Sequence, residues 1–381
     1  MARTWTTWNS ALALSLLLAT SGALAAQAIP DKPQAAAKRV FAADFPHLVD
    51  HQWPDYEIGG FGGIERGAAR RHVPLIMVHG NDVDHADWYP VRDDFKAAGW
   101  TNQELWGLAY NGAGGSNGSA TMRTNPERDA EHTEVCGAAG CNAVVTSNDV
   151  NVPDLYDFVM TVRAYTGSEK FSIAAHSLGV TLGRKLLKVH PELRRDLVAF
   201  VAIAGANHGT SFCPEGSQGQ LNSCDEIAAG TPWLAELNGP NGDDESYGPA
   251  QWLTVYDGTG AGDPAFEGPT YAQSPLLKGA DNRQFPGTYH NDLRIDAPIV
   301  AEYRKFIEDA EMRQARDGTS AGSLSPGVLL ALLLGCWASP RFRGSQPSLR
   351  RYAQDYGAAC AGVRFMCTFQ LPSRCFFQTL R

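Results

Sequence analysis

The chain has 381 residues, of which 44% are hydrophobic, and a formal net charge of −9 at pH 7. A chain of this length and composition can bury one sizeable core. Nucleic acids and anionic membrane surfaces favour basic patches, so the negative charge argues against both as partners. Small neutral or apolar substrates fit this charge better.

The first 28 residues have the pattern of a secretory signal peptide. Arg3 precedes an apolar stretch at 11–18, and small residues with Ala-x-Ala patterns follow at 23–28. The apolar stretch is too short for a stable bilayer anchor. We therefore expect cleavage near Ala25 or Ala28 and a secreted or periplasmic location for the rest of the chain.

Two further segments follow, a main domain over 40–311 and a tail over 312–381. The tail contains a short apolar run at 328–338, and arginines come after it. This pattern is typical of a C-terminal sorting or anchoring signal, which predicts weak membrane association or surface anchoring. The alternative interpretation is a poorly ordered tail without function.

Within the main domain, apolar stretches typical of buried strands alternate with helical patterns. The expected strands are 73–78, 105–110, 171–176, 198–204 and 252–256, and the expected helices are 87–98, 152–165, 178–189 and 298–307. Continuous apolar strands between helices indicate βαβ units. The sequence therefore predicts an α/β fold, with a mostly parallel central sheet and helices on both faces.

Ser177 lies where the strand 171–176 ends and a helical pattern begins. A serine hydroxyl is a poor nucleophile unless a base removes its proton, and a sharp strand-to-helix turn holds it clear of the fold. Such a corner tolerates only small side chains two residues on either side, which here are Ala175 and Gly179. The pattern predicts a nucleophile elbow, and the alternative is an ordinary strand-to-helix corner.

Candidates for a base and an acid follow Ser177 in the chain order nucleophile, acid, histidine. His290 lies in the loop before the last amphipathic helix, and we expect it to be the base. The glycine-rich turn after strand 252–256 holds two candidate acids. We prefer Asp263, which can reach back from the far end of the turn, and Asp257 is the rival. The alternative for both is that they only cap turns.

The expected oxyanion donors are two backbone amides. One belongs to Leu178, at the start of the new helix, and the other to Asn81, in the loop after strand 73–78. Two other histidines are not expected to act as the base. His176 precedes the serine and should point away from it, and His208 should shape the turn after its strand.

Four cysteines in the main domain form two closely spaced pairs. In an exported protein these pairs predict local disulfides, Cys136 with Cys141 and Cys213 with Cys224. No histidine cluster accompanies them, so we do not expect a metal site. No organic cofactor is expected either.

These motifs together resemble the α/β-hydrolase superfamily over most of the main domain. The motifs are Val78-His79-Gly80, Ala175-His176-Ser177-Leu178-Gly179 and Asn207-His208-Gly209-Thr210. They resemble those of secreted bacterial class 2 lipases and of the related extracellular polyhydroxyalkanoate depolymerases. The resemblance implies an α/β-hydrolase catalytic domain over 40–311, with Ser177 as nucleophile, His290 as base and Asp263 as acid. It also implies that the amides of Asn81 and Leu178 bind the oxyanion.

The leading hypothesis is a secreted serine hydrolase of carboxylic esters, of the lipase or esterase type. Its partner would be a small-molecule or polymeric ester substrate. One alternative is an extracellular polyhydroxyalkanoate depolymerase. Another, from a different class, is a non-catalytic binding protein that kept the hydrolase scaffold.

Overall fold

The computed structural model describes residues 37–51, 54–65, 67–81, 83–110, 147–215 and 222–322, with side chains for all of these except 222 and 318–322. The strands in this part of the chain are β1 (Arg39–Phe41), β2 (Gly59–Gly62), β3 (Leu75–Val78), β4 (Leu105–Ala109), β5 (Phe171–His176), β6 (Leu197–Ile203), β7 (Gln251–Tyr256) and β8 (Asp281–Gln284). The predicted signal peptide, the Cys136 and Cys141 pair and the apolar run of the tail lie outside these residues.

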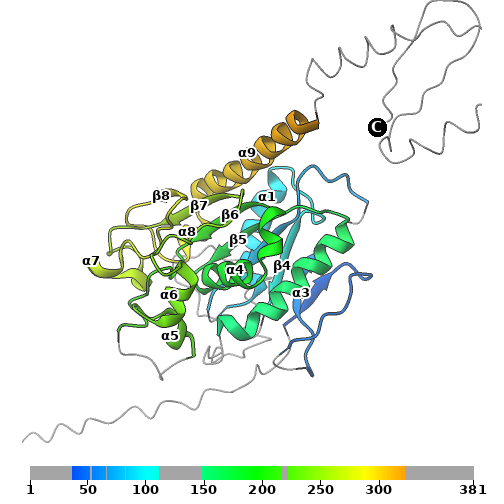
Figure 1. The fold of residues 1–381 in the computed structure, drawn as a ribbon. Helices are drawn as coiled ribbons and strands as arrows, with labels where there is room; N and C mark the ends of the chain where they lie inside the picture. The colour runs from blue at the N-terminus through cyan, green and yellow to red at the C-terminus, as the bar shows by residue number, and fades with distance from the viewer. Residues whose placement is uncertain are drawn as a thin grey trace, which may run out of the picture. The chain divides into compact units, whose positions relative to one another are not determined.

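The strands form one sheet in the order β1-β2-β4-β3-β5-β6-β7-β8 (Figure 1). All strands from β3 to β8 are parallel to one another. β1 and β2 are parallel to each other, and β2 is antiparallel to β4. The predicted α/β fold with a mostly parallel sheet is confirmed, and the strand order and helix placement are those of an α/β-hydrolase.

Three strands, β1, β2 and β8, have no counterpart among the predicted strands, and each lacks a long apolar run. β2 reads Gly-Gly-Phe-Gly, and its backbone passes very close to side chains and backbone of its neighbours. A Cβ on Gly62, for example, would lie 2.3 Å from the ring of Trp106 in β4. β8 reads Asp-Asn-Arg-Gln and is the last strand of the sheet, with largely exposed residues. Polar or glycine-rich strands of this kind give no alternating or apolar signal.

The helices are α1 (Tyr89–Ala97), α3 (Asn148–Thr166), α4 (Leu178–Val189), α5 (Asn222–Ile227), α6 (Pro232–Asn238), α7 (Gly268–Tyr271), α8 (Asp292–Ile295) and α9 (Ala297–Gly322), with short 3-10 helices η1 (His85–Trp88), η2 (Pro191–Arg195) and η3 (Pro264–Phe266). Among the described residues, no helix has the length and apolarity that crossing a bilayer requires.

Helix α3 begins at Asn148, four residues before the start that the apolar spacing predicts. Glu226 of α5 accepts hydrogen bonds from the backbone amides of Asn148 at 2.6 Å and Asp149 at 3.2 Å. These are amides of the first turn, which have no acceptor within the helix. A carboxylate that is distant in sequence thus caps the helix, and a local pattern cannot reveal such a cap.

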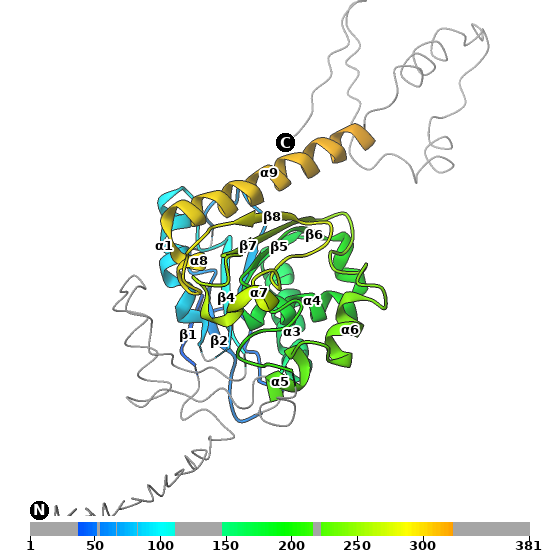
Figure 2. The ribbon, with the colours of Figure 1, turned by 90° about the vertical axis from the view of Figure 1, so that its left-hand side faces the viewer.

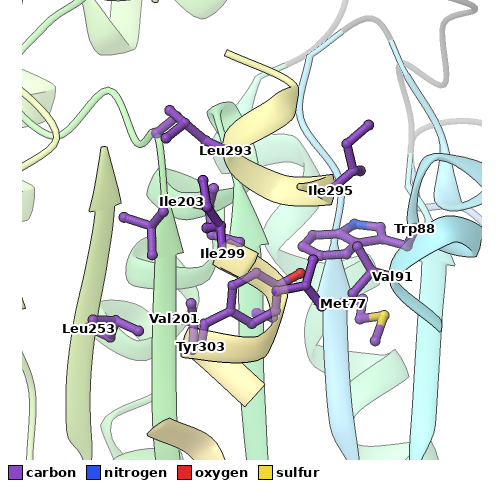
Figure 3. Close-up of a cluster of buried hydrophobic side chains, with 14 of the residues drawn as sticks. Met77, Trp88, Val91, Val201, Ile203, Leu253, Leu293, Ile295, Ile299 and Tyr303 are labelled. Carbon is purple, nitrogen blue, oxygen red and sulfur yellow. The ribbon is translucent and has the colours of Figure 1, made fainter. Parts of the chain in front are cut away.

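Two layers of helices cover the sheet because successive strand residues point to opposite faces. Leu75 and Met77 of β3 belong to the buried cluster on the side of α1, α8 and α9, whereas Ile76 and Val78 belong to the cluster under α3 and α4. Figures 1 and 2 show the two layers, and Figure 3 shows Tyr303 of α9 among the side chains of the first cluster. The parallel strands bring their carboxyl ends to one edge of the sheet.

At that edge the first turn of α4 lies against the end of β3. A Cβ on Gly179 would lie 2.3 Å from the carbonyl oxygen of His79 and 2.7 Å from that of Val78. Both obstacles are backbone atoms, which cannot rotate away. Glycine at position 179 is therefore needed for the strand and the helix to approach this closely.

We predict that Gly179→Ala destabilises the protein by about 2–3 kcal/mol, the range expected for overpacking against rigid atoms. Gly183→Ala, in the same helix, is the matched control. Its new Cβ would meet the Phe200 ring at 3.0 Å, and a side chain can shift. Alanine also has the higher helix propensity, so this variant should stay close to wild type. Thermal unfolding measures both, and equal melting temperatures for the two variants would contradict the prediction.

Helix α9 is fastened to the start of β3 by a histidine and a carboxylate. His72 Nδ1 lies 2.8 Å from Glu311 Oε2, the amide of Val73 donates to Glu311 Oε1 at 3.0 Å, and the His72 ring stacks on Trp100 at 3.9 Å. Burial disfavours the imidazolium, but the hydrogen bond and charge of Glu311 outweigh it and raise the pKa of His72 above 6.5. The folded state thus binds the His72 proton more tightly than the unfolded chain does.

The pKa of His72 is higher in the folded protein than in the unfolded chain. The stabilisation by the His72–Glu311 contact is therefore fully present below the unfolded-state pKa, and it is lost as the pH rises through the folded-state pKa. We predict that His72→Gln lowers the melting temperature clearly at about pH 5.5 and much less at about pH 8.5. The difference between wild type and variant removes the pH dependence of all other groups. A difference in melting temperature that is constant across this pH range would contradict a stabilising contact between protonated His72 and Glu311.

Candidate active site

Ser177 occupies a strained corner between β5 and α4. Its φ is 56° and its ψ is −126°, and Ala204 is the other non-glycine residue with positive φ in the described part of the chain. Such a conformation costs about 1–3 kcal/mol and persists only when its surroundings impose it. The Ser177 amide donates to Ile203 O at 2.8 Å, and the Val180 amide donates to Ser177 O at 3.0 Å. The corner has the geometry of a nucleophile elbow.

The loop after β3 lies directly against this corner. A Cβ on Gly80 would lie 2.8 Å from the Ser177 Cβ, so glycine is needed here too, and Asn81 follows it. The backbone amide of Leu178 is the first of α4, where amides lack helical acceptors and the helix dipole is positive. The two predicted oxyanion residues therefore lie on the two segments that border Ser177.

His79 and Tyr110 hold the loop after β3 in place. The amide of Tyr110 donates to His79 Nε2 at 3.3 Å, which makes His79 Nδ1 the protonated nitrogen and the donor to Gly80 O at 2.8 Å. The Tyr110 hydroxyl donates to His79 O at 2.6 Å, and the two rings stack at 3.8 Å. Burial lowers the pKa of His79 to about 4, so the ring stays neutral and keeps this tautomer.

His290 lies in the loop between β8 and α8, which we call the base loop. Its ring faces the glycine-rich loop after β7 that contains Asp257 and Asp263, which we call the acid loop. Its Nδ1 is 2.8 Å from Oδ2 of Asp263, which is 1% exposed. The other carboxylate oxygen of Asp263 accepts the Ala265 amide at 2.8 Å, which fixes the carboxylate in place. A hydrogen on Nδ1 that is donated to Asp263 leaves Nε2 as the acceptor, and this is the nitrogen a general base uses.

Asp257, the rival acid, makes a different set of contacts. It accepts hydrogen bonds from the amides of Thr259 at 3.0 Å and Gly260 at 3.1 Å, and from the amide of Gly287 at 2.5 Å. Burial raises the pKa of Asp257, but the bonds from Thr259 and Gly287 outweigh it and lower the pKa below 3.8. Asp257 thus shapes the acid loop and ties it to the loop of His290.

The ring of His176 lies against the base loop. Its Nε2 is 3.1 Å from the carbonyl oxygen of His290, and the two ring centroids are 4.7 Å apart. Sequence reasoning assigned no role to this histidine, and it also missed the buried ion pair of Arg294 and Asp87 beside it. Both members of the pair have charged neighbours in sequence, so no local pattern singles them out.

His208 shapes the turn after β6, as expected from the sequence. Its backbone amide donates to Ser274 Oγ at 3.0 Å, and its ring nitrogens lie 2.9 Å from Ser274 O and 3.0 Å from Glu245 Oε1. These contacts join the turn to the segment before β8 through Ser274 and to the segment before β7 through Glu245.

The predicted disulfide between Cys213 and Cys224 is confirmed. It joins the turn after β6 to α5, and the Ser211 amide in that turn donates to Ala265 O at 2.9 Å. The disulfide segment therefore borders the acid loop. Within the described ranges, no group of three or more His, Cys, Asp or Glu side chains is arranged to hold a metal ion.

Comparison with known proteins finds a family model that resembles the central segment. Residues 138–248 match the family model described as lipase (class 2). The matched segment contains β5, Ser177 and the His208 turn, and it ends before the acid and histidine loops. The predicted resemblance to class 2 lipases is thereby confirmed. Among curated proteins, no sequence matches the chain.

Several solved structures align with the chain at low identity. Bacillus licheniformis lipase BlEst2 in its mature form aligns at 10% identity and a TM-score of 0.44, over 66% of this chain and 97% of that one. Aspergillus fumigatus lipase B aligns at 17% identity and a TM-score of 0.39, over 61% of this chain. The aligned part of this chain spans 47% of the length of the fungal lipase. Naproxen esterase from Bacillus subtilis aligns at 12% identity and a TM-score of 0.34, over 66% of this chain and 86% of that one.

We predict that Asp263→Asn lowers kcat for a p-nitrophenyl ester by about 10³- to 10⁴-fold without loss of fold, because the amide no longer holds His290 in the required tautomer. Asp257→Asn is the matched control at the other end of the same loop. It should lower the melting temperature and change kcat far less. Steady-state kinetics and thermal unfolding separate the two effects, and a larger kcat loss in Asp257→Asn would exchange the two roles.

Proposed function

We propose that this protein is a carboxylic ester hydrolase that acts outside the cytoplasm through an acyl-enzyme on Ser177. It has the α/β-hydrolase fold, and its residues 138–248 match the class 2 lipases. The observation that carries the proposal is the contact between His290 and the buried Asp263 at the sheet edge where β5 ends in the strained Ser177. The contact of His176 with His290 O supports it further, because it brings the base loop to the elbow.

In the proposed reaction, Ser177 Oγ attacks the ester carbonyl carbon while its proton moves to Nε2 of His290. Asp263 stabilises the imidazolium that forms. The amides of Asn81 and Leu178 donate to the oxyanion of the tetrahedral intermediate, each worth about 10²- to 10³-fold in rate. The intermediate collapses, and the alcohol leaves with the proton from His290. A water molecule activated by the same histidine then releases the acid and restores Ser177.

Two features support action outside the cytoplasm. One is the signal-peptide pattern of the first 28 residues. The other is the Cys213–Cys224 disulfide, since such bonds form and persist mainly in oxidising compartments.

The central test is Ser177→Ala. We predict that it abolishes hydrolysis of p-nitrophenyl butyrate and labelling by a fluorophosphonate, with a loss on the order of 10⁶-fold in kcat. Ser172→Ala is the matched control: Ser172 lies in the same strand, is fully buried, and its hydroxyl has no hydrogen-bond partner among the described residues. This control should keep wild-type activity. Turnover that survives in Ser177→Ala would falsify the acyl-enzyme.

The substrate class requires a comparison of three substrates, namely emulsified triglyceride, a soluble short-chain ester and a polyhydroxybutyrate film. The proposed lipase or esterase hydrolyses one or both of the first two. Clearing of the film alone would replace it with the polyester depolymerase. Absence of Ser177-dependent turnover and labelling on every substrate would favour the non-catalytic scaffold.

A further inference from the structure

A network of buried polar side chains lies next to the candidate site. It joins Asp87 of η1, Arg294 of α8 and His176 of β5, with exposed fractions of 1%, 0% and 2%. Arg294 Nη1 forms an ion pair with Asp87 Oδ2 and lies 3.3 Å from His176 Nδ1. The other nitrogen of His176 reaches His290 O at 3.1 Å.

The chemistry of these partners fixes the tautomer of His176. A guanidinium only donates, so His176 Nδ1 must be the unprotonated acceptor toward Arg294. The hydrogen then lies on Nε2, which donates to the carbonyl oxygen of His290. Burial, and next the charge of Arg294, hold the pKa of His176 well below its ordinary value, so the ring stays neutral.

Each residue of this network comes from a different segment of the candidate site. Asp87 follows the loop that carries Asn81, His176 immediately precedes Ser177, and Arg294 lies four residues after His290. A buried ion pair adds little net stability, because desolvation offsets most of the attraction. The use of this ion pair is therefore geometric, because it fixes the position of its two side chains. The Trp88 ring, 5.6 Å from the guanidinium, helps to restrain Arg294.

We propose that His176 is a positioning residue for the base. Its Nε2–H, oriented by Arg294, holds the backbone of His290 at the elbow, so that the imidazole keeps its place between Asp263 and the serine. The proposal rests on the proposed function, because it assigns His290 the role of base. A displacement of about 1 Å in a reacting group can cost about 10²-fold in rate, so a hydrogen bond one residue from the nucleophile can control kcat.

The test compares His176→Leu with His176→Gln. The leucine removes the donor, and the glutamine amide can place an N–H near the position of Nε2. We expect His176→Leu to lower kcat for p-nitrophenyl butyrate by about 10- to 100-fold with unchanged KM, and His176→Gln to restore most of it. His72→Leu is the control for loss of a partly buried histidine outside the site, and it should keep wild-type kcat.

An unchanged kcat in His176→Leu, or an equal loss in the leucine and glutamine variants, would overturn the proposal while leaving the Ser177 chemistry intact. If the leucine variant fails to fold, nitrogen NMR of histidine-labelled wild-type protein still decides. The expected result is a neutral His176 with its hydrogen on Nε2 from about pH 5 to about pH 8. Titration of His176 in that range, or a hydrogen on Nδ1, would also overturn it. This measurement does not depend on ester hydrolysis, so it distinguishes failure of the network from failure of the proposed function.

Discussion

The close packing of the β3 end against the elbow is the constraint on which the rest of the site depends. Gly80 meets the Ser177 Cβ, and Gly179 meets the carbonyl oxygens of β3, at distances that admit no side chain. This contact places the start of α4 beside the loop of Asn81. It also helps to impose the positive φ of Ser177, which an isolated chain would abandon.

The loops that carry Asp263 and His290 are arranged around this contact by hydrogen bonds to the backbone. Parallel strands bring the ends of β3, β5, β7 and β8 to one edge, and Asp257 ties the acid loop to Gly287. Asp263 is then free to face His290. The two aspartates of this loop thus have different contacts. Asp257 shapes the loop, and Asp263 contacts the imidazole of His290.

The sequence predicts the central part of the fold well, because buried parallel strands are continuous apolar runs and small residues flank Ser177. It also favours Asp263 over its rival Asp257 by reach, and in the structure Asp263 is the one whose carboxylate contacts His290. These features are local, so a one-dimensional pattern contains them.

Features that depend on distant partners are not in the pattern. The start of α3 depends on Glu226, and the roles of Asp87, His176 and Arg294 depend on elements that are far apart in the chain. The glycines of β2 are required by neighbours that are distant in sequence, as Gly62 is by the Trp106 ring and Gly60 by the Gly107 carbonyl oxygen. In each case the deciding neighbour becomes visible only when the chain has folded.

The polar composition of β8 also affects how the sheet ends. Among the described residues β8 has one strand partner, β7, and its Arg283 is paired with Asp281 and with Glu302 of α9. A further strand that docked there would have to strip water from these charges, which is costly. The charges on β8 therefore discourage edge-to-edge association between molecules.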